Sequence, residues 1–257
     1  MFGKPVHPAG PKPAALFVSI IVAAAALHAG CNTTPPPDQP TEAPPDTQPT
    51  ERTISLPASA DNTLYEDAEG SLSNGAGQHL FAGLTSRELF RRGVLFFDVA
   101  GGIPAGAQIT SVVLRLSLSR TASDEPREIG LHRLLSAWGE GASAAEGTEG
   151  AGAAAATGDA TWLHTVFPDG FWAAPGGDFV EMPSATTSVG AVGSYQWGST
   201  SDMVSDVQAW LDEPASNQGW VVIGDEATPG TAARFDSREN TDEAVRPELA
   251  VTFAEPS

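Results

Sequence analysis

The clearest pattern along the chain is an alternation of apolar and polar positions, which is typical of β-strands. In residues 112–118, Leu114, Leu116 and Leu118 fall on one face of a strand and the residues between them on the other. Residues 94–97 form a continuous apolar run, as in a strand buried on both faces. Further strands are predicted at 54–58, 129–135, 220–223, 234–237 and 249–253. Turns rich in glycine and proline separate these segments.

One segment has helical spacing instead. Apolar residues from Val204 to Leu211 recur at intervals of three and four. Ser201 or Asp202 could cap the start of this helix, and Pro214 marks its end. One short helix among many short strands predicts an all-β fold, a jelly-roll-like antiparallel β-sandwich.

The first fifty residues have a different composition and predict a targeting segment. Residues 16–27 form an apolar run that is too short to span a bilayer but fits a secretory signal. Small residues follow, and then Cys31, the only cysteine, which resembles the lipidated cysteine of a bacterial lipobox. Residues 32–51 are rich in proline and threonine and predict a disordered linker. We therefore expect a signal peptide at 1–31, a lipid on Cys31 and a β-domain at 52–257.

This organisation predicts export. The lipid would hold the protein at the cell envelope, and the protein would be secreted if Cys31 is not processed. The lipid anchor is the only contact with a membrane that the sequence predicts.

The charge narrows the class of partner. The chain carries 32 acidic residues and a net charge of −19, and both lysines, Lys4 and Lys12, precede Cys31. Cleavage before Cys31 would leave 11 arginines against 32 acidic residues, a net charge of −21. Nucleic-acid binding is therefore not expected, because phosphate contacts need clustered basic residues. A polyanionic glycan is also disfavoured, unless a cation bridges it to the protein or the arginines cluster locally.

Catalytic motifs are missing from the sequence. No nucleophile elbow, no zinc-binding H-E-x-x-H and no phosphate-binding glycine loop is found. Carboxylates are so numerous that a pair at glycosidase spacing would arise by chance. We therefore expect a protein that is not an enzyme.

Acidic residues at the start of the β-domain raise a metal hypothesis. Asp61, Glu66 and Asp67 are close in sequence, and calcium prefers carboxylate and carbonyl oxygens. A structural Ca²⁺ is the cofactor that these residues would hold. The alternative is a solvated acidic loop, since the spacing of calcium-binding loops is absent.

Aromatic residues are the candidates for sugar stacking, because flat rings exclude water from a sugar face. Trp162 and Trp172 lie in a loop-rich stretch and are the first choice, and Tyr195 and Trp197 are the second. The alternative for the first pair is that this stretch folds back and covers one sheet. We expect two further tryptophans, Trp210 and Trp220, in the core.

A series of short patches, in order over nearly 200 residues, resembles the DNRLRE domain, classified as carbohydrate-binding module family 96. The patches are ADNTLY (60–65), RGVLFFD (92–98), WGEG (138–141), GDATW (158–162), PGGDF (175–179), NQGW (217–220), FDSRE (235–239) and RPEL (246–249). The resemblance implies a jelly-roll-like sandwich on secreted or surface proteins, and some members bind acidic polysaccharides such as alginate. We assign its recurrent residues Asp98, Arg238 and Glu239 to structure, with Arg238 as a partner for Asp98.

These observations favour a non-catalytic, lipid-anchored surface protein that binds polysaccharide. Two alternatives stay open. One is a structural or adhesive domain with a protein partner, and the other is an orphan polysaccharide hydrolase or lyase.

Overall fold

The computed structural model describes residues 50–256. The predicted signal peptide, the lipidation of Cys31 and nearly all of the predicted linker lie outside these residues. Strand β1 begins at Glu51, one residue before the predicted start of the domain. No helix within 50–256 has the length and apolar character needed to cross a membrane.

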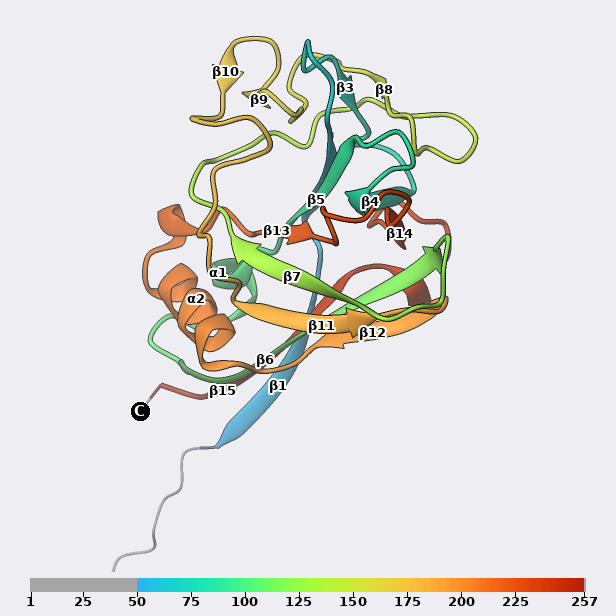
Figure 1. Ribbon diagram of the computed structural model, residues 1–257. Helices are drawn as coiled ribbons and strands as arrows, with labels where there is room; N and C mark the ends of the chain where they lie inside the picture. Colours follow the sequence, from blue (N-terminus) through green and yellow to red (C-terminus); the bar gives the residue numbers. More distant parts are fainter. Residues whose placement is uncertain (1–49, 257) are drawn as a thin grey trace, which may run out of the picture. The chain divides into compact units, whose positions relative to one another are not determined.

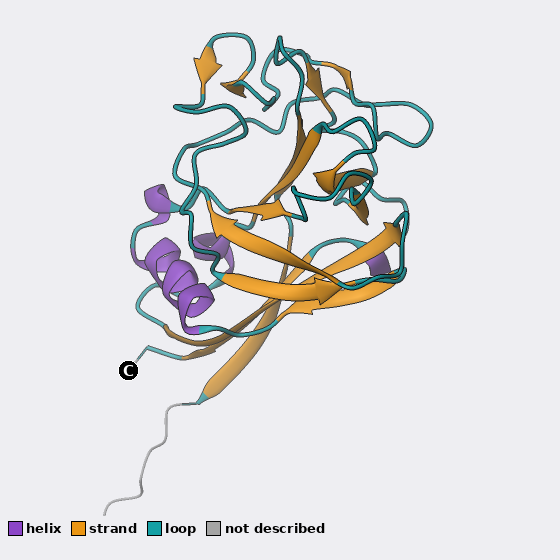
Figure 2. Ribbon diagram, in the orientation of Figure 1, coloured by secondary structure: helices purple, strands orange, loops and turns teal. Residues whose placement is uncertain are grey.

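Antiparallel strands dominate the domain, which confirms the predicted all-β fold (Figure 2). The largest sheet has eleven strands, in the order β1-β15-β6-β14-β4-β5-β13-β7-β11, with β12 beside β6 and β2 beside β5. The longer strands are β1 (Glu51–Pro57), β2 (Ala60–Tyr65), β4 (His79–Leu84), β5 (Phe90–Phe96), β6 (Gln108–Arg120), β7 (Arg127–Arg133), β11 (Ala185–Val189), β12 (Gly193–Trp197), β13 (Trp220–Ile223), β14 (Ala233–Asp236) and β15 (Glu248–Ala254). Two small sheets pair β3 (Leu72–Ser73) with β8 (Ala153–Ala154) and β9 (His164–Val166) with β10 (Gly170–Phe171).

Strand β4 joins the two halves of the curled sheet. Its first four residues pair with β14, and its last two, Gly83 and Leu84, pair with β5. One large core cluster combines side chains from both halves, such as Leu114 and Leu116 of β6 with Leu95 of β5 and Trp220 of β13. The sheet therefore closes over its own apolar face, as in a sandwich.

Helix α2 (Ser201–Asp212) covers part of this core, and its cap differs by one residue from the prediction. The side chain of Thr200, not of Ser201 or Asp202, accepts a hydrogen bond from the backbone N–H of Met203. Trp210 of α2 meets Trp220 edge to face, with ring centroids 4.4 Å apart and both side chains buried, as predicted. Figure 1 shows α2 beside the four-residue helix α1 (Val99–Gly102).

A second core cluster lies on the other side of β5 and β13. It contains Leu64, Val94 and Val221. Leu95, which follows Val94 in the sequence, and Trp220, which precedes Val221, belong to the first cluster. Strand β5 is thus buried on both faces, as its continuous apolar run predicted. The segment from Leu134 to Ser184 covers this second face, among the loops at the top of Figure 1.

Residues 141–160, which are rich in glycine and alanine, have a defined conformation because the Asp159 side chain is hydrogen-bonded to their backbone. The Asp159 carboxylate is fully buried and accepts hydrogen bonds from the backbone N–H groups of Ala142, Ser143 and Ala156. A side chain at Gly141 would collide with this carboxylate, which explains the glycine.

Candidate functional site

The four aromatic residues predicted as a sugar platform do not form one. Trp162 and Trp172 are 7% and 6% exposed, because the stretch that carries them folds back onto the second core cluster. Trp197 is fully buried, and its indole N–H donates to the carbonyl of Ile129. The interpretation in which this stretch covers one sheet is therefore the correct one, and the predicted stacking role of these tryptophans is wrong.

Tyr195, the fourth candidate, is half-buried, and its hydroxyl is hydrogen-bonded to the backbone of the turn that precedes β12. Its hydroxyl donates to the carbonyl of Ala191 and accepts from the N–H of Gly190. The aromatic ring that does reach solvent in the predicted stretch is Phe171, which is 63% exposed and lies 4.5 Å from the ring of His164.

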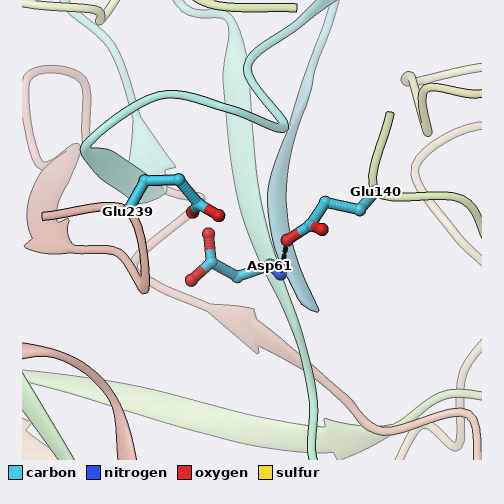
Figure 3. Close-up of side chains that lie close together, drawn as sticks. All are labelled: Asp61, Glu140 and Glu239. Carbon is cyan, nitrogen blue, oxygen red and sulfur yellow. Dashed lines mark hydrogen bonds between the residues drawn. The ribbon is translucent and has the colours of Figure 1, made fainter. Parts of the chain in front are cut away.

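Three of the sequence patches converge on a cluster of carboxylates. We call Asp61, Glu140 and Glu239 the carboxylate cluster; they come from the ADNTLY, WGEG and FDSRE patches, and Figure 3 shows their oxygens facing one another. The Arg238 guanidinium bridges two of them, with Nε 2.6 Å from Glu140 Oε1 and 2.9 Å from Glu239 Oε1. The backbone N–H of Arg238 donates to Asp61, and that of Asp61 donates to Glu140. The assignment of Arg238 and Glu239 to structure agrees with these contacts.

Burial shifts the protonation of this cluster. Desolvation raises the pKa of Asp61 well above its ordinary value, and it raises the pKa of Glu239 to about 7. The hydrogen bond to Glu140 raises the pKa of Arg238, which keeps its charge. The Arg238 charge therefore offsets part of the negative charge of the cluster, and Asp61 and Glu239 bind protons more readily than they would in water.

The other residues of the metal hypothesis lie outside this cluster. Glu66 accepts a hydrogen bond from the backbone N–H of Phe90, and Asp67 accepts from Ser71. The predicted grouping of Asp61 with Glu66 and Asp67 is therefore wrong, because the sheet brings Asp61 to residues far away in the sequence.

Asp98 is not a partner of Arg238 either. Its side chain accepts from the backbone N–H of Gly101 and caps helix α1, while Arg238 pairs with Glu140 and Glu239. Asp98 keeps a structural role, but a different one from that predicted.

The carboxylate cluster suits calcium poorly. Three carboxylates supply some of the six to eight oxygens that calcium takes. The Arg238 guanidinium, however, already binds two of them, and a second cation would be repelled by it. The arrangement favours a guanidinium with protons over a calcium ion.

A different group of charges lines a cavity of about 290 Å³ beside β14 and β4. Three arginines, Arg91, Arg120 and Arg234, lie around it, and we call it the arginine pocket. Its other lining residues are Phe81, Thr85, Thr121, Ala122, Thr148, Gly150 and Ala232.

Arg91 is buried at this site and pre-positioned. Its guanidinium donates to the carbonyls of Gly150 and Phe90 and lies 4.8 Å from the centre of the Tyr65 ring. Burial lowers the pKa of Arg91, but an arginine in a protein stays charged.

Arg120 and Arg234 lie directly opposite each other on β6 and β14. Like charges in this arrangement destabilise a sheet. Arg234 Nε donates to the hydroxyl of Ser119, which is a neutral partner.

The arginine pocket is exceptional in this acidic domain. Among the described residues, seven of the eleven arginines lie within 4.0 Å of a carboxylate oxygen. Three of the other four line this pocket, and the fourth, Arg87, follows the lining residue Thr85 by two positions. The arginines that have no acidic partner within the described part of the chain thus concentrate in one place.

Sequence reasoning missed this pocket, although it left open that arginines might gather. Its arginines are spread from position 91 to 234 and belong to three strands. The available signal was an arginine near a strand end in each case. Their proximity depends on the strand order β6-β14-β4-β5, which is a long-range property.

A second cavity, of about 170 Å³, adjoins the arginine pocket and shares Thr121 and Ala122 with it. Its lining includes the apolar side chains of Leu118, Ile129 and Val189. Both cavities are lined by residues of the segment that follows β6.

A scan against protein-family models finds no family that matches the chain, and a search of curated proteins finds no similar sequence. The likeness to the DNRLRE domain stays a prediction from the sequence patches.

Proposed function

We propose that this protein is a non-catalytic, DNRLRE-like binding module for an acidic polysaccharide, exported and held at the cell envelope by a lipid on Cys31. The arginine pocket is the observation that carries the proposal. In a domain of strongly negative charge, its three arginines face one cavity without a carboxylate within ion-pair distance.

The chemistry of the pocket favours an anion on the ligand. A carboxylate or sulfate would pair with Arg120 and Arg234 and relieve the repulsion between these opposed side chains. Arg91 adds a buried positive charge in surroundings of low dielectric constant, where its attraction for an anion is strong. Arginine suits this role because its guanidinium binds planar carboxylates through two hydrogen bonds.

The size of the pocket favours one unit of a polymer. A volume of about 290 Å³ lies at the small end of ligand sites and accommodates roughly one sugar ring. The adjoining cavity has a mixed lining: apolar side chains such as Leu118 and Ile129 would contact the C–H face of a neighbouring ring, and the carboxylates of Glu125 and Asp225 would face its hydroxyl groups. A chain that crosses Thr121 and Ala122 would reach both cavities.

The carboxylate cluster supports a binding role more than a catalytic one. Asp61 is 1% exposed, and Glu140 and Glu239 both pair with Arg238. A glycosidase needs two carboxyl groups that reach the substrate from either side of the bond.

A binding experiment tests the proposal. The purified chain and its Arg120→Gln/Arg234→Gln variant are titrated with polygalacturonate, alginate and a neutral glucan. We expect the unmodified chain to bind a polyuronate and not the glucan, and the variant to bind at least tenfold more weakly, a loss of about 1.4 kcal/mol. Arg115→Gln is the matched control, because Arg115 pairs with Glu248 away from the pocket. If the double variant and the unmodified chain bind with equal affinity, the arginine pocket is not the binding site.

A second candidate function is adhesion to a protein partner. Four of the large hydrophobic side chains that are exposed in the described part of the chain belong to one segment, from Leu135 to Met182. Exposed apolar side chains mark a protein-binding site where they form a contiguous patch. Leu135→Ser/Met182→Ser should abolish attachment to a protein-coated surface without changing polyuronate binding, and unchanged attachment would dismiss this candidate.

A further inference from the structure

One wall of the arginine pocket is a short strap, residues 148–150. Thr148 and Gly150 line the cavity, whereas Glu149 between them is 8% exposed and points into the protein. Thr148 and the Gly150 backbone therefore line the cavity, and the Glu149 carboxylate does not.

The buried Glu149 side chain is tied at several points. Its Oε2 accepts from the side-chain amide of Asn74 and from the backbone N–H of His79, both at 2.9 Å. His79 Nδ1 lies 3.2 Å from Glu149 Oε1 without hydrogen-bond geometry. The Tyr65 hydroxyl donates to the Glu149 carbonyl at 2.9 Å.

The backbone of Glu149 has an unusual conformation for a residue with a side chain. Its φ is +62°, in the left-handed region that favours glycine. The chain uses glycine for positive φ on either side, at Gly147 and Gly152. A strained non-glycine residue persists only where its surroundings hold it, and such residues are common at ligand sites.

The strap also holds Arg91. The Gly150 carbonyl accepts from both Nε and Nη2 of Arg91 at 3.3 Å. Tyr65 meets both partners, through its hydroxyl to Glu149 and through its ring to the Arg91 guanidinium. The buried Glu149 side chain and the Arg91 guanidinium are thus connected through one peptide unit.

We propose that Glu149 is a positioning residue of the arginine pocket. Its buried side chain fixes the strap, so that the Gly150 carbonyl orients Arg91 and no carboxylate faces the three arginines. The role in ligand binding rests on the proposed function, but the orientation of Arg91 does not.

Three substitutions in the full chain test this inference. Glu149→Ala removes the tether, and Glu149→Gln keeps a side-chain oxygen that can accept from Asn74 and His79. Glu149→Gly relieves the backbone strain without restoring the tether. Glu146→Ala is the control, because Glu146 belongs to the same loop but is exposed.

The first readout needs no ligand. The Arg91 Nε–H signal in nuclear magnetic resonance should exchange slowly with water, because this group is buried and hydrogen-bonded. We expect Glu149→Ala and Glu149→Gly to speed its exchange at least tenfold and Glu149→Gln to restore slow exchange. Unchanged exchange in Glu149→Ala would overturn the inference. Slow exchange in Glu149→Gly, as in the unmodified chain, would also overturn it, because the strap would then keep its place without the Glu149 side chain.

The second readout is affinity for polygalacturonate. We expect at least a fivefold loss in Glu149→Ala, recovery to within about twofold in Glu149→Gln, and no change in Glu146→Ala. Equal binding by the unmodified chain and Glu149→Ala would overturn the positioning role and leave the proposed function standing. A chain that binds no polyuronate, with fast Arg91 exchange in Glu149→Ala, would overturn the proposed function and support the positioning of Arg91.

If Glu149→Ala does not fold, Glu149→Asp replaces it. The shorter side chain of this variant withdraws the carboxylate from Asn74 and His79. Faster Arg91 exchange in Glu149→Asp would support the inference, and unchanged exchange would overturn it.

Discussion

The carboxylate cluster and the arginine pocket differ in whether their arginines are paired with carboxylates. In the carboxylate cluster, three acidic groups surround one arginine and satisfy it. In the arginine pocket, three arginines share a cavity with neutral lining groups. Both bring together residues from distant parts of the chain, so the difference lies in which charges the fold leaves without a partner.

This difference separates a site that stabilises the domain from a site suited to a ligand. A charge that is paired within the protein is costly to leave without its partner, and its hydrogen-bonding groups are already occupied. Opposed arginines cost stability, and an external anion would recover that cost. Two of the recurrent residues of the DNRLRE-like patches, Arg238 and Glu239, fall in the carboxylate cluster, and Asp98 caps helix α1 instead. The arginine pocket was not predicted from those patches.

The largest expected effect is on stability, at the carboxylate cluster. Arg238→Ala leaves Glu140 and Glu239 without their counter-charge, and we expect it to lower the free energy of unfolding by about 2–3 kcal/mol, since Arg238 is partly exposed. Urea unfolding measures this. Arg246→Ala is the control, because its partner Glu243 is 84% exposed. A loss no greater than that of the control would show that the carboxylate cluster does not stabilise the fold.

The next effect is a dependence of stability on pH. The pKa of Glu239 is raised from its ordinary 4.5 to about 7, so between these values the folded protein holds a proton that the unfolded chain has released. This stabilisation is complete below about pH 4.5 and is lost as pH rises through about 7. Asp61 acts in the same direction.

We expect the free energy of unfolding to fall by about 1–2 kcal/mol between pH 5 and 8, and Glu239→Gln to flatten this slope. The lowered pKa values of Asp225 and Glu248 act the other way in more acidic solution, and the lowered pKa of His132 acts the other way just below pH 6.5. Urea unfolding across this pH range provides the measurement. An equal slope in the Gln variant would assign the pH dependence to other groups.

A smaller effect of opposite sign is expected in the arginine pocket. Arg120→Glu places a negative charge directly opposite Arg234 and should stabilise the domain by about 0.5 kcal/mol. The same change should abolish polyuronate binding. Thermal unfolding at low salt measures the gain, and a destabilised variant would contradict the repulsion that we infer.

The smallest expected effect is that of calcium. Because Arg238 already binds two members of the carboxylate cluster, we expect millimolar calcium to leave the unfolding temperature unchanged. A rise that disappears in Glu239→Gln would show that calcium can displace the guanidinium, and would restore the metal hypothesis at Asp61, Glu140 and Glu239.

The sequence by itself determined seven of the eleven longer strands, the helix and much of the core, whereas β2, β4, β11 and β12 were not predicted. Alternation along β6 and helical spacing along α2 are local patterns with fixed periods, and they are visible without knowledge of the fold. The same holds for Trp210 and Trp220, which lie within strongly apolar patterns. Local patterns also placed Trp162 and Trp172 correctly in a loop-rich stretch.

Only the tertiary structure decided what those loops and charges do. The second face of β5 and β13 is apolar, so the stretch with Trp162 and Trp172 folds over it and the tryptophans become core. Arg91, Arg120 and Arg234 meet because β14 pairs with both β6 and β4, and β4 pairs with β5. Strand pairing joins residues that are far apart in the sequence, and alternation within one strand does not specify its neighbour. The paired carboxylates and the unpaired arginines are therefore both products of long-range pairing.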